Sequence, residues 1–190
     1  CWTLDPELLE RKLDTELRGR AWREGLGPYR WEPIGIVLHV LAGNVFVGAA
    51  GSLVEGLITR NVSILRMSSS ETLFLPQLVR TLQECDEDGV ISRALAVVDY
   101  ASSQKDVIDG LKKGVDGIVV WGGEQAVRAY RDGLPARSRL IVFGPKLSVA
   151  VVTQQGLERR TVAAWAERLA REISIWDQNA CTAPQACYVE

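Results

Sequence analysis

Hydrophobic residues along this chain recur in two alternating patterns. Continuous runs of Val, Ile and Leu, typical of strands buried on both faces of a sheet, occupy residues 32–40, 61–67, 94–100, 116–122, 139–144 and 147–153. Apolar residues at the three- and four-residue spacing of helices occur at 45–60, 70–84, 104–113, 124–133 and 158–176. A further helix is expected from Leu4 to Arg20, with Asp5 as N-cap and Pro6 as its first residue.

Strands that alternate with helices in this way predict an α/β fold in which a parallel sheet carries helices on both faces. Such a sheet binds its ligand at the carboxyl ends of the strands. The alternation stops near Pro145, so we expect one domain over residues 1–144 and the beginning of a second over 145–190. The last residues read as a strand in progress, and we expect the chain to be part of a longer protein.

The composition is that of an ordinary globular protein. There are 22 Lys and Arg residues against 24 Asp and Glu, a net charge of −2, so we expect no basic face for nucleic acid or an anionic membrane. The longest apolar stretch, from Ile34 to Leu65, is interrupted by charged residues and glycines, and the N-terminus reads as a charged helix rather than a signal peptide. These features favour a cytoplasmic protein without a membrane span.

Four cysteines, at positions 1, 85, 181 and 187, form no C-x-x-C pair, and His39 is the single histidine. This composition argues against a zinc cluster and favours free thiols. We assign no role to His39, because a lone histidine in an apolar run is more often a core residue than a catalyst. Cys1 and Cys85 are interpreted as inert, and Cys187 as a packing residue.

Cys181 is the strongest candidate for chemistry. It follows the longest of the internal helices expected here, lies in the stretch WDQNACTAPQ, and precedes Pro184, which favours a turn or extended chain. A thiol in a polar loop can ionise and meet a substrate. Most intracellular cysteines are not nucleophiles, however, so the position alone does not establish one.

Two glycines mark a second candidate site. Gly122 and Gly123 follow a buried strand and precede a helix, so the backbone can approach a ligand and the free N–H groups of the helix can hold a pyrophosphate. The motif is not a full G-x-G-x-x-G. A tight turn that binds nothing explains the two glycines equally well.

Two other strand ends carry polar residues. Arg66 and Ser68, in the stretch ILRMSSSE, suit the ribose and a 2′-phosphate of a dinucleotide. The commoner alternative makes Ser70 a helix N-cap and Arg66 a surface charge. Asn44 follows the first strand of the alternating region, where its amide can donate to a developing oxyanion, although Gly-Asn is also ordinary turn chemistry.

In combination and in order, these sites resemble those of the aldehyde dehydrogenase superfamily. Within it, the chain is most similar to the long-chain acyl-CoA reductases of bacterial luminescence operons, the LuxC-like family. The similarity spans most of residues 32–190 and is carried by HVLAGNVFVGAAGSLVEGLITRNVSILRMSSSE, GIVVWGGEQAVRAYR, RLIVFGPKLSVAVV and EISIWDQNACTAPQACYVE.

The activity that this resemblance implies is reduction of a fatty acyl-CoA to a fatty aldehyde through a cysteinyl acyl-enzyme. It makes Cys181 the nucleophile that becomes acylated and Asn44 the oxyanion-hole asparagine. It also implies that residues 1–144 are a Rossmann-like nucleotide-binding domain and that 145–190 begin the catalytic domain. A homo-oligomer is implied for the full-length protein.

For the cofactor, the resemblance places Arg66 and Ser68 at the adenosine ribose and Gly122 and Gly123 at the pyrophosphate turn. Arg66 stands where dehydrogenases often have a lysine, which favours NADPH, with NADH as the alternative.

The chain departs from the superfamily pattern in two places. Aldehyde-oxidising members carry Glu-Leu-Gly-Gly-Lys where residues 142–146 read VFGPK, so the base that activates a hydrolytic water is missing. An enzyme that passes an acyl group between a thiol and hydride has no use for that base. Phe46 stands where we expect proline in the luminescence relatives. Two alternatives stay open: an acyl-phosphate reductase of the same superfamily, and a dinucleotide-binding module without catalysis.

Overall fold

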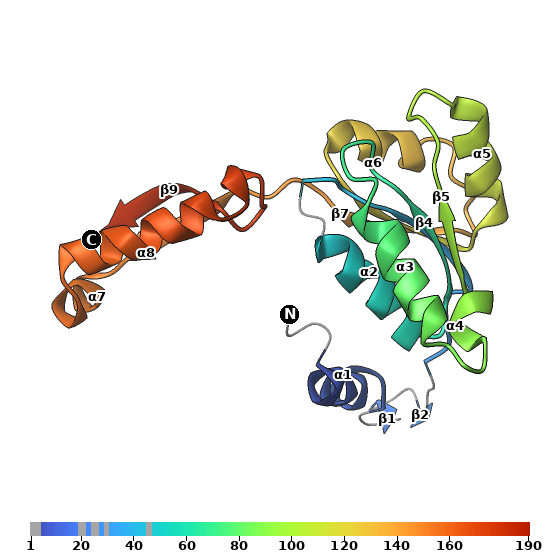
Figure 1. Ribbon diagram of the computed structural model, residues 1–190, viewed down its shortest axis with the longest axis horizontal. Coiled ribbons are helices and arrows are strands. Elements are labelled where there is room, and N and C mark those ends of the chain that lie inside the picture. Colours follow the sequence, from blue (N-terminus) through green and yellow to red (C-terminus); the bar gives the residue numbers. More distant parts are fainter. Residues whose placement is uncertain (1–4, 19–21, 24–26, 29–30, 45–46) are drawn as a thin grey trace.

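A computed structural model describes residues 5–18, 22–23, 27–28, 31–44 and 47–190; Cys1 and Phe46 lie outside them. The chain forms a five-stranded parallel sheet with helices on both faces, as the α/β prediction requires. An arm (residues 148–190) extends from one end of this unit and carries a two-stranded parallel sheet of its own (Figure 1).

The strands of the main sheet lie in the order β5-β4-β3-β6-β7. Their bounds are β3 (Ile36–Val40), β4 (Val62–Arg66), β5 (Leu95–Val98), β6 (Gly117–Trp121) and β7 (Arg139–Phe143). The helices between them are α2 (Val47–Ile58), α3 (Phe74–Glu84), the short α4 (Val90–Arg93), α5 (Lys105–Gly114) and α6 (Glu124–Arg131).

The helices divide between the two faces of the sheet, and each face has its own apolar layer (Figure 1). Leu38 and Ile118 belong to the layer beneath α5 and α6. Leu65 of β4 packs with Leu53 of α2 and Leu75 of α3 on the other face. Burial on both faces is the reason that these strands read as continuous apolar runs in the sequence.

The N-terminal helix starts where the sequence predicts. In α1 (Pro6–Leu13) the Asp5 side chain accepts from the N–H of Glu7, and Pro6 occupies the first turn. The helix is shorter than expected and passes into a π-helical turn, η2 (Asp14–Arg18). A small antiparallel pair, β1 (Trp22–Arg23) and β2 (Gly27–Pro28), follows.

The arm contains β8 (Ser148–Val152), α7 (Gln154–Arg159), α8 (Val162–Ser174), a 3-10 turn η3 (Ile175–Gln178) and β9 (Pro184–Val189). The single helix predicted over 158–176 is therefore wrong. Thr161 adopts extended backbone and its side chain accepts from the N–H of Ala164, so it caps a new helix that begins at Val162.

The interpretation of Ser70 as a helix N-cap is also wrong. Helix α3 begins only at Phe74, and the carboxylate of Glu71 accepts from the N–H groups of Leu73 and Phe74, at 2.9 and 2.6 Å. A carboxylate at this position satisfies two helix-start donors, so the serine is not needed for that task.

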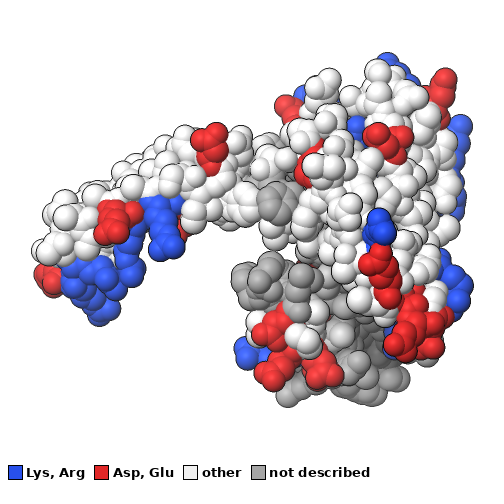
Figure 2. All heavy atoms as spheres, in the orientation of Figure 1, with Lys and Arg blue, Asp and Glu red and all other residues white. Residues whose placement is uncertain are grey.

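Charged side chains of both signs are interspersed over the visible face of the main unit, and basic side chains gather at the far end of the arm (Figure 2). In the part of the chain that the structure describes, the helices are all too short or too polar for a bilayer span.

Gly56 of α2 packs against two buried polar groups of the sheet. A Cβ at this position would lie 2.5 Å from Ser63 Oγ and 3.0 Å from His39 Nε2. Gly51, in the same helix, has open space around the corresponding point. We expect Gly56→Ala to lower the free energy of unfolding by about 1–2 kcal/mol, because the cost of overpacking exceeds the gain in helix propensity.

The matched variant Gly51→Ala should raise the free energy of unfolding by up to about 1 kcal/mol. Urea denaturation measures both. Adding Ser63→Ala to Gly56→Ala should restore part of the loss, since it removes the nearer atom. Equal stabilisation by both glycine replacements would show that α2 is not packed as described.

Candidate active site

The carboxyl ends of β3 and β6 mark the point at which the chain reverses its direction across the sheet. From β3 it adds β4 and β5 on one side, and it then crosses back to place β6 on the other side of β3. Open parallel sheets bind their ligands outside the strand ends at such a switch point. Asn44 follows β3, and Gly122 and Gly123 follow β6, so three of the predicted site residues flank this point.

Asn44 connects this edge of the sheet with the loop that carries Cys181. Its Nδ2 donates to the backbone oxygen of Asn179 at 2.6 Å, two positions before the cysteine. The backbone oxygen of Cys181 accepts from Ser148 Oγ at 2.6 Å, which ties the loop to the start of β8. Cys181 itself is a free, exposed thiol. The structure thus brings the two predicted catalytic residues into neighbouring turns.

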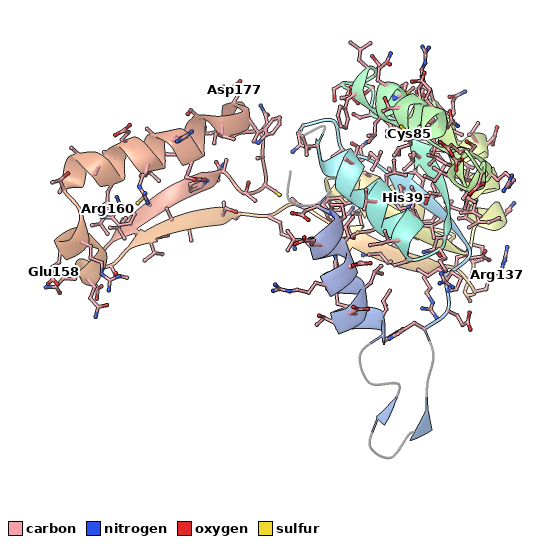
Figure 3. The ribbon with its side chains drawn as sticks, turned by 60° about the horizontal axis from the view of Figure 1, so that its bottom comes forward. His39, Cys85, Arg137, Glu158, Arg160 and Asp177 are labelled. Atoms are coloured by element: carbon pink, nitrogen blue, oxygen red, sulfur yellow. The ribbon has the colours of Figure 1, made fainter. Side chains whose placement is uncertain are left out.

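The chain reaches this loop through an unusual backbone turn. Trp176, Asp177 and Gln178 have φ values of 61°, 50° and 58°, a left-handed conformation that costs roughly 1–2 kcal/mol for each residue with a side chain. Asp177 lies at the end of α8 that is nearer the sheet (Figure 3). The turn redirects the chain from α8 toward Asn44, and Asn179 steadies it by donating from Nδ2 to the Asp177 backbone oxygen at 3.0 Å.

The turns after β3 and β4 pack tightly together. The Gly43 backbone lies against the hydroxyl groups of Ser68 and Ser70, and a Cβ at position 43 would overlap both. The two hydroxyl oxygens are 3.0 Å apart. A side chain at position 43 would force these serines to move, and Ser68 lies next to the turn that presents Asn44.

Arg66, the last residue of β4, is held by Tyr100. Its Nη2 donates to the Tyr100 backbone oxygen at 3.0 Å, and its guanidinium carbon lies 5.3 Å from the centre of the Tyr100 ring. Its Nε is buried and has no partner among the described residues. The side chain is half-buried rather than a surface charge, so that alternative is wrong.

Tyr100 in turn shares a buried hydrogen bond of 2.7 Å with the hydroxyl of Tyr130 in α6. Burial raises the pKa of Tyr100 far above its usual range. The phenol therefore stays neutral beside Arg66.

Gly122 and Gly123 form the turn from β6 into α6. The N–H of Gly122 donates to the backbone oxygen of Phe143 at 3.3 Å. Gly123 is the N-cap of α6, no side chain caps this helix start, and a Cβ at position 123 would meet nothing within 4 Å. The acidic residue of the first turn, Glu124, is paired with Arg128. Open N–H groups at a helix start suit an anionic group.

Comparison with known proteins decides the family. A profile of the family described as acyl-CoA reductase (LuxC) matches residues 3–190. The chain belongs to the LuxC family.

Curated relatives agree with this membership. The long-chain acyl-protein thioester reductase of Vibrio harveyi is 32% identical over 158 residues, which cover 82% of this chain and 32% of the relative. The reductase of the same name from Photobacterium phosphoreum is 30% identical and is covered to 31%. This LuxC-family chain therefore spans about a third of the length of these relatives.

Solved structures show that the fold is that of aldehyde dehydrogenases. A mutant propionaldehyde dehydrogenase from the fucose utilisation microcompartment of Clostridium phytofermentans matches 96% of this chain, and 43% of its own chain is covered (TM-score 0.70, identity 13%). An NAD-dependent aldehyde dehydrogenase from Burkholderia multivorans matches 96% and is covered to 35% (TM-score 0.68, identity 18%). The glyceraldehyde-3-phosphate dehydrogenase GapN of Methanocaldococcus jannaschii, complexed with NADP, matches 85% and is covered to 35% (TM-score 0.67, identity 15%).

Two residues of this edge are absent from the sequence-based candidates. Tyr100 ends a predicted strand at the same edge of the sheet as Arg66, and this position at a strand end could have identified it as a candidate site residue. Asn179 contributes its backbone oxygen to Asn44, and a backbone atom leaves no signal in the residue type.

Proposed function

We propose that this chain is the cofactor-binding and nucleophile-bearing part of a reductase that converts a long-chain acyl thioester to an aldehyde with NADPH. The hydrogen bond from Asn44 to the Cys181 loop carries the proposal, because it joins the residue proposed as oxyanion donor to the loop of the proposed nucleophile. The family description and the relatives' names, acyl-CoA reductase and acyl-protein thioester reductase, both specify an acyl thioester.

Residues at this edge fit a phosphorylated dinucleotide. The start of α6 at Gly123 offers uncapped N–H groups for a pyrophosphate. Arg66, two positions before Ser68, provides a cation at the end of β4, and a guanidinium there suits a 2′-phosphate and favours NADPH over NADH. A bound cofactor supplies the hydride that reduces the acyl group.

Cys181 and Asn44 perform the acyl transfer in this proposal. The Cys181 thiolate forms a bond to the acyl carbonyl carbon, the bond to the donor's sulfur breaks, and the donor leaves as a thiol after taking up a proton. The Asn44 amide has two N–H groups, of which one holds Asn179 and the other is free to stabilise the oxyanion. After reduction, the thiohemiacetal on Cys181 collapses to release the aldehyde and restore the thiolate.

We place the domain boundary between residues 144 and 145, so that 1–144 bind the nucleotide and 145–190 begin the catalytic domain. The end of the main sheet at Phe143 and the start of a separate sheet at Ser148 support this division.

Acylation of the chain tests the proposed function. Incubation with radiolabelled long-chain acyl-CoA should leave a covalent label that hydroxylamine removes, and NADPH should release the label as aldehyde. If an acyl phosphate labels the chain and acyl-CoA does not, the acyl donor is an acyl phosphate and not a thioester. Absence of label from either donor would contradict an acyl-enzyme on this chain.

Removal of the Arg66 guanidinium tests the choice of cofactor. We expect Arg66→Ala to weaken NADPH binding by about 10- to 100-fold, the size of a charge-assisted hydrogen bond, and to weaken NADH binding much less. Fluorescence titrations give both dissociation constants. Arg66→Lys, which keeps the charge, should retain most of the preference. An equal loss for both cofactors would remove Arg66 from the 2′-phosphate site.

A further inference from the structure

A chain of polar contacts, buried at His39 and Ser52 and partly buried at Trp121, runs from β3 through α2 to the end of β6. His39 of β3 is 2% exposed, and its Nδ1 lies 2.8 Å from Ser52 Oγ in α2. Trp121, the last residue of β6, donates from Nε1 to the same Ser52 Oγ at 3.1 Å. His39, labelled in Figure 3, lies against α2. One buried hydroxyl therefore joins the histidine to the tryptophan.

Trp121 fixes the ends of two strands. Its ring stacks on Phe143 with centroids 3.9 Å apart and planes 7° from parallel. The two residues are register partners at the carboxyl ends of β6 and β7, and the N–H of Gly122 donates to the Phe143 backbone oxygen. The Trp121 ring thus packs at the point where the glycine turn begins and where the chain leaves the sheet toward the arm.

The stability of the core does not explain a histidine at position 39. Burial lowers the pKa of His39 to about 4, so the ring is neutral at neutral pH. Ser52 Oγ accepts from Trp121 and also contacts Nδ1, so Nε2 is the ring nitrogen left to find another partner. That nitrogen is buried without a partner among the described residues. A leucine would fill the space without an unpaired polar atom, which is costly in a protein interior.

We propose that His39, acting through Ser52, is a positioning residue for the Gly122–Gly123 turn. Its contact with Ser52 Oγ keeps that oxygen within reach of the Trp121 N–H, and the Trp121–Phe143 stack then fixes the turn. The importance of the turn rests on the cofactor site proposed above. The geometry of the network does not depend on it.

Hydrogen–deuterium exchange of the backbone amides tests the network in the free chain. His39→Leu, Ser52→Ala and Trp121→Phe should each speed exchange at Gly122 by about tenfold, the effect of losing one hydrogen bond. Amides of β4 and β5 should be unaffected. Ser63→Ala is the matched control, since it removes a neighbouring buried hydroxyl that has no partner among the described residues, and it should leave exchange at Gly122 unchanged.

A double-mutant cycle separates positioning from general packing. If His39 acts through Trp121, adding His39→Leu to Trp121→Phe should cause little further change at Gly122. His39→Gln, which keeps a hydrogen-bonding group, should restore slow exchange and restore NADPH affinity lost in His39→Leu.

Unchanged exchange at Gly122 in Ser52→Ala and Trp121→Phe would overturn the proposal, and these variants decide it even if His39→Leu does not fold. Full additivity in the cycle would also overturn it. If the wild-type chain does not bind NADPH, only the proposed cofactor site is contradicted. The exchange measurements test the His39–Ser52–Trp121 network independently of cofactor binding.

Discussion

Cys181→Ala should reduce covalent acylation of the chain to background. The substitution removes one sulfur atom from an exposed loop position, so the fold should be preserved while the atom that forms the thioester is lost. Without a nucleophile there is no acyl-enzyme, and the expected loss is complete rather than partial. Radiolabelled acyl-CoA followed by denaturing electrophoresis measures the effect directly.

The other described cysteines provide matched controls. Cys85 and Cys187 are also free thiols, and Cys187 lies in β9, six positions after Cys181. Cys85→Ala and Cys187→Ala should each label as the wild type does. If the label persists on Cys181→Ala and disappears with Cys187→Ala, the nucleophile is Cys187 in β9 and not Cys181.

Asn44→Ala should slow acylation by about 100- to 1000-fold, the usual effect of removing one oxyanion donor. Two contributions are lost together. The amide no longer donates to the developing oxyanion, and the loop loses its hydrogen bond at Asn179. Single-turnover labelling with excess acyl-CoA gives the rate, and quenching the reaction at increasing times separates slow acylation from absent acylation.

Two further variants separate the contributions of Asn44. Asn179→Ala keeps the backbone oxygen that accepts from Asn44 but loses the side-chain bond to Asp177, so it should slow acylation far less. Asn44→Asp keeps the size of the side chain but places a carboxylate where negative charge develops, and it should be at least as slow as Asn44→Ala. A rate for Asn44→Ala within a few fold of the wild type would exclude this residue from the oxyanion site.

Much of the architecture was predictable because its causes are local. The apolar runs of the sequence became strands β3 to β8, of which β3 and β6 are buried most completely, and the Asp5-Pro6 pair marked the start of α1. The order of Asn44, Arg66, Gly122 and Cys181 along the chain identified the family that the profile comparison confirmed.

What could not be predicted depends on contacts between distant residues. The break before α8 comes from Thr161, whose capping role could not be distinguished from a mid-helix position by periodicity alone. Three consecutive left-handed residues at 176–178 contradict local preference, and surrounding structure must hold them. The pairing of Arg66 with Tyr100 joins the ends of two neighbouring strands, so the local sequence around either residue does not predict it.

The strand order also has a consequence for the connectivity of the chain. Val37 of β3 pairs with Ser63, 26 positions later, and with Gly117, 80 positions later. Loop-closure entropy grows only logarithmically with length, so the longer closure costs about 1 kcal/mol more than the shorter one. That penalty is small beside the several kcal/mol by which domains are normally stable. The chain can therefore cross back to the other side of β3 at little cost in stability, and this crossing places candidate binding residues on both sides of β3.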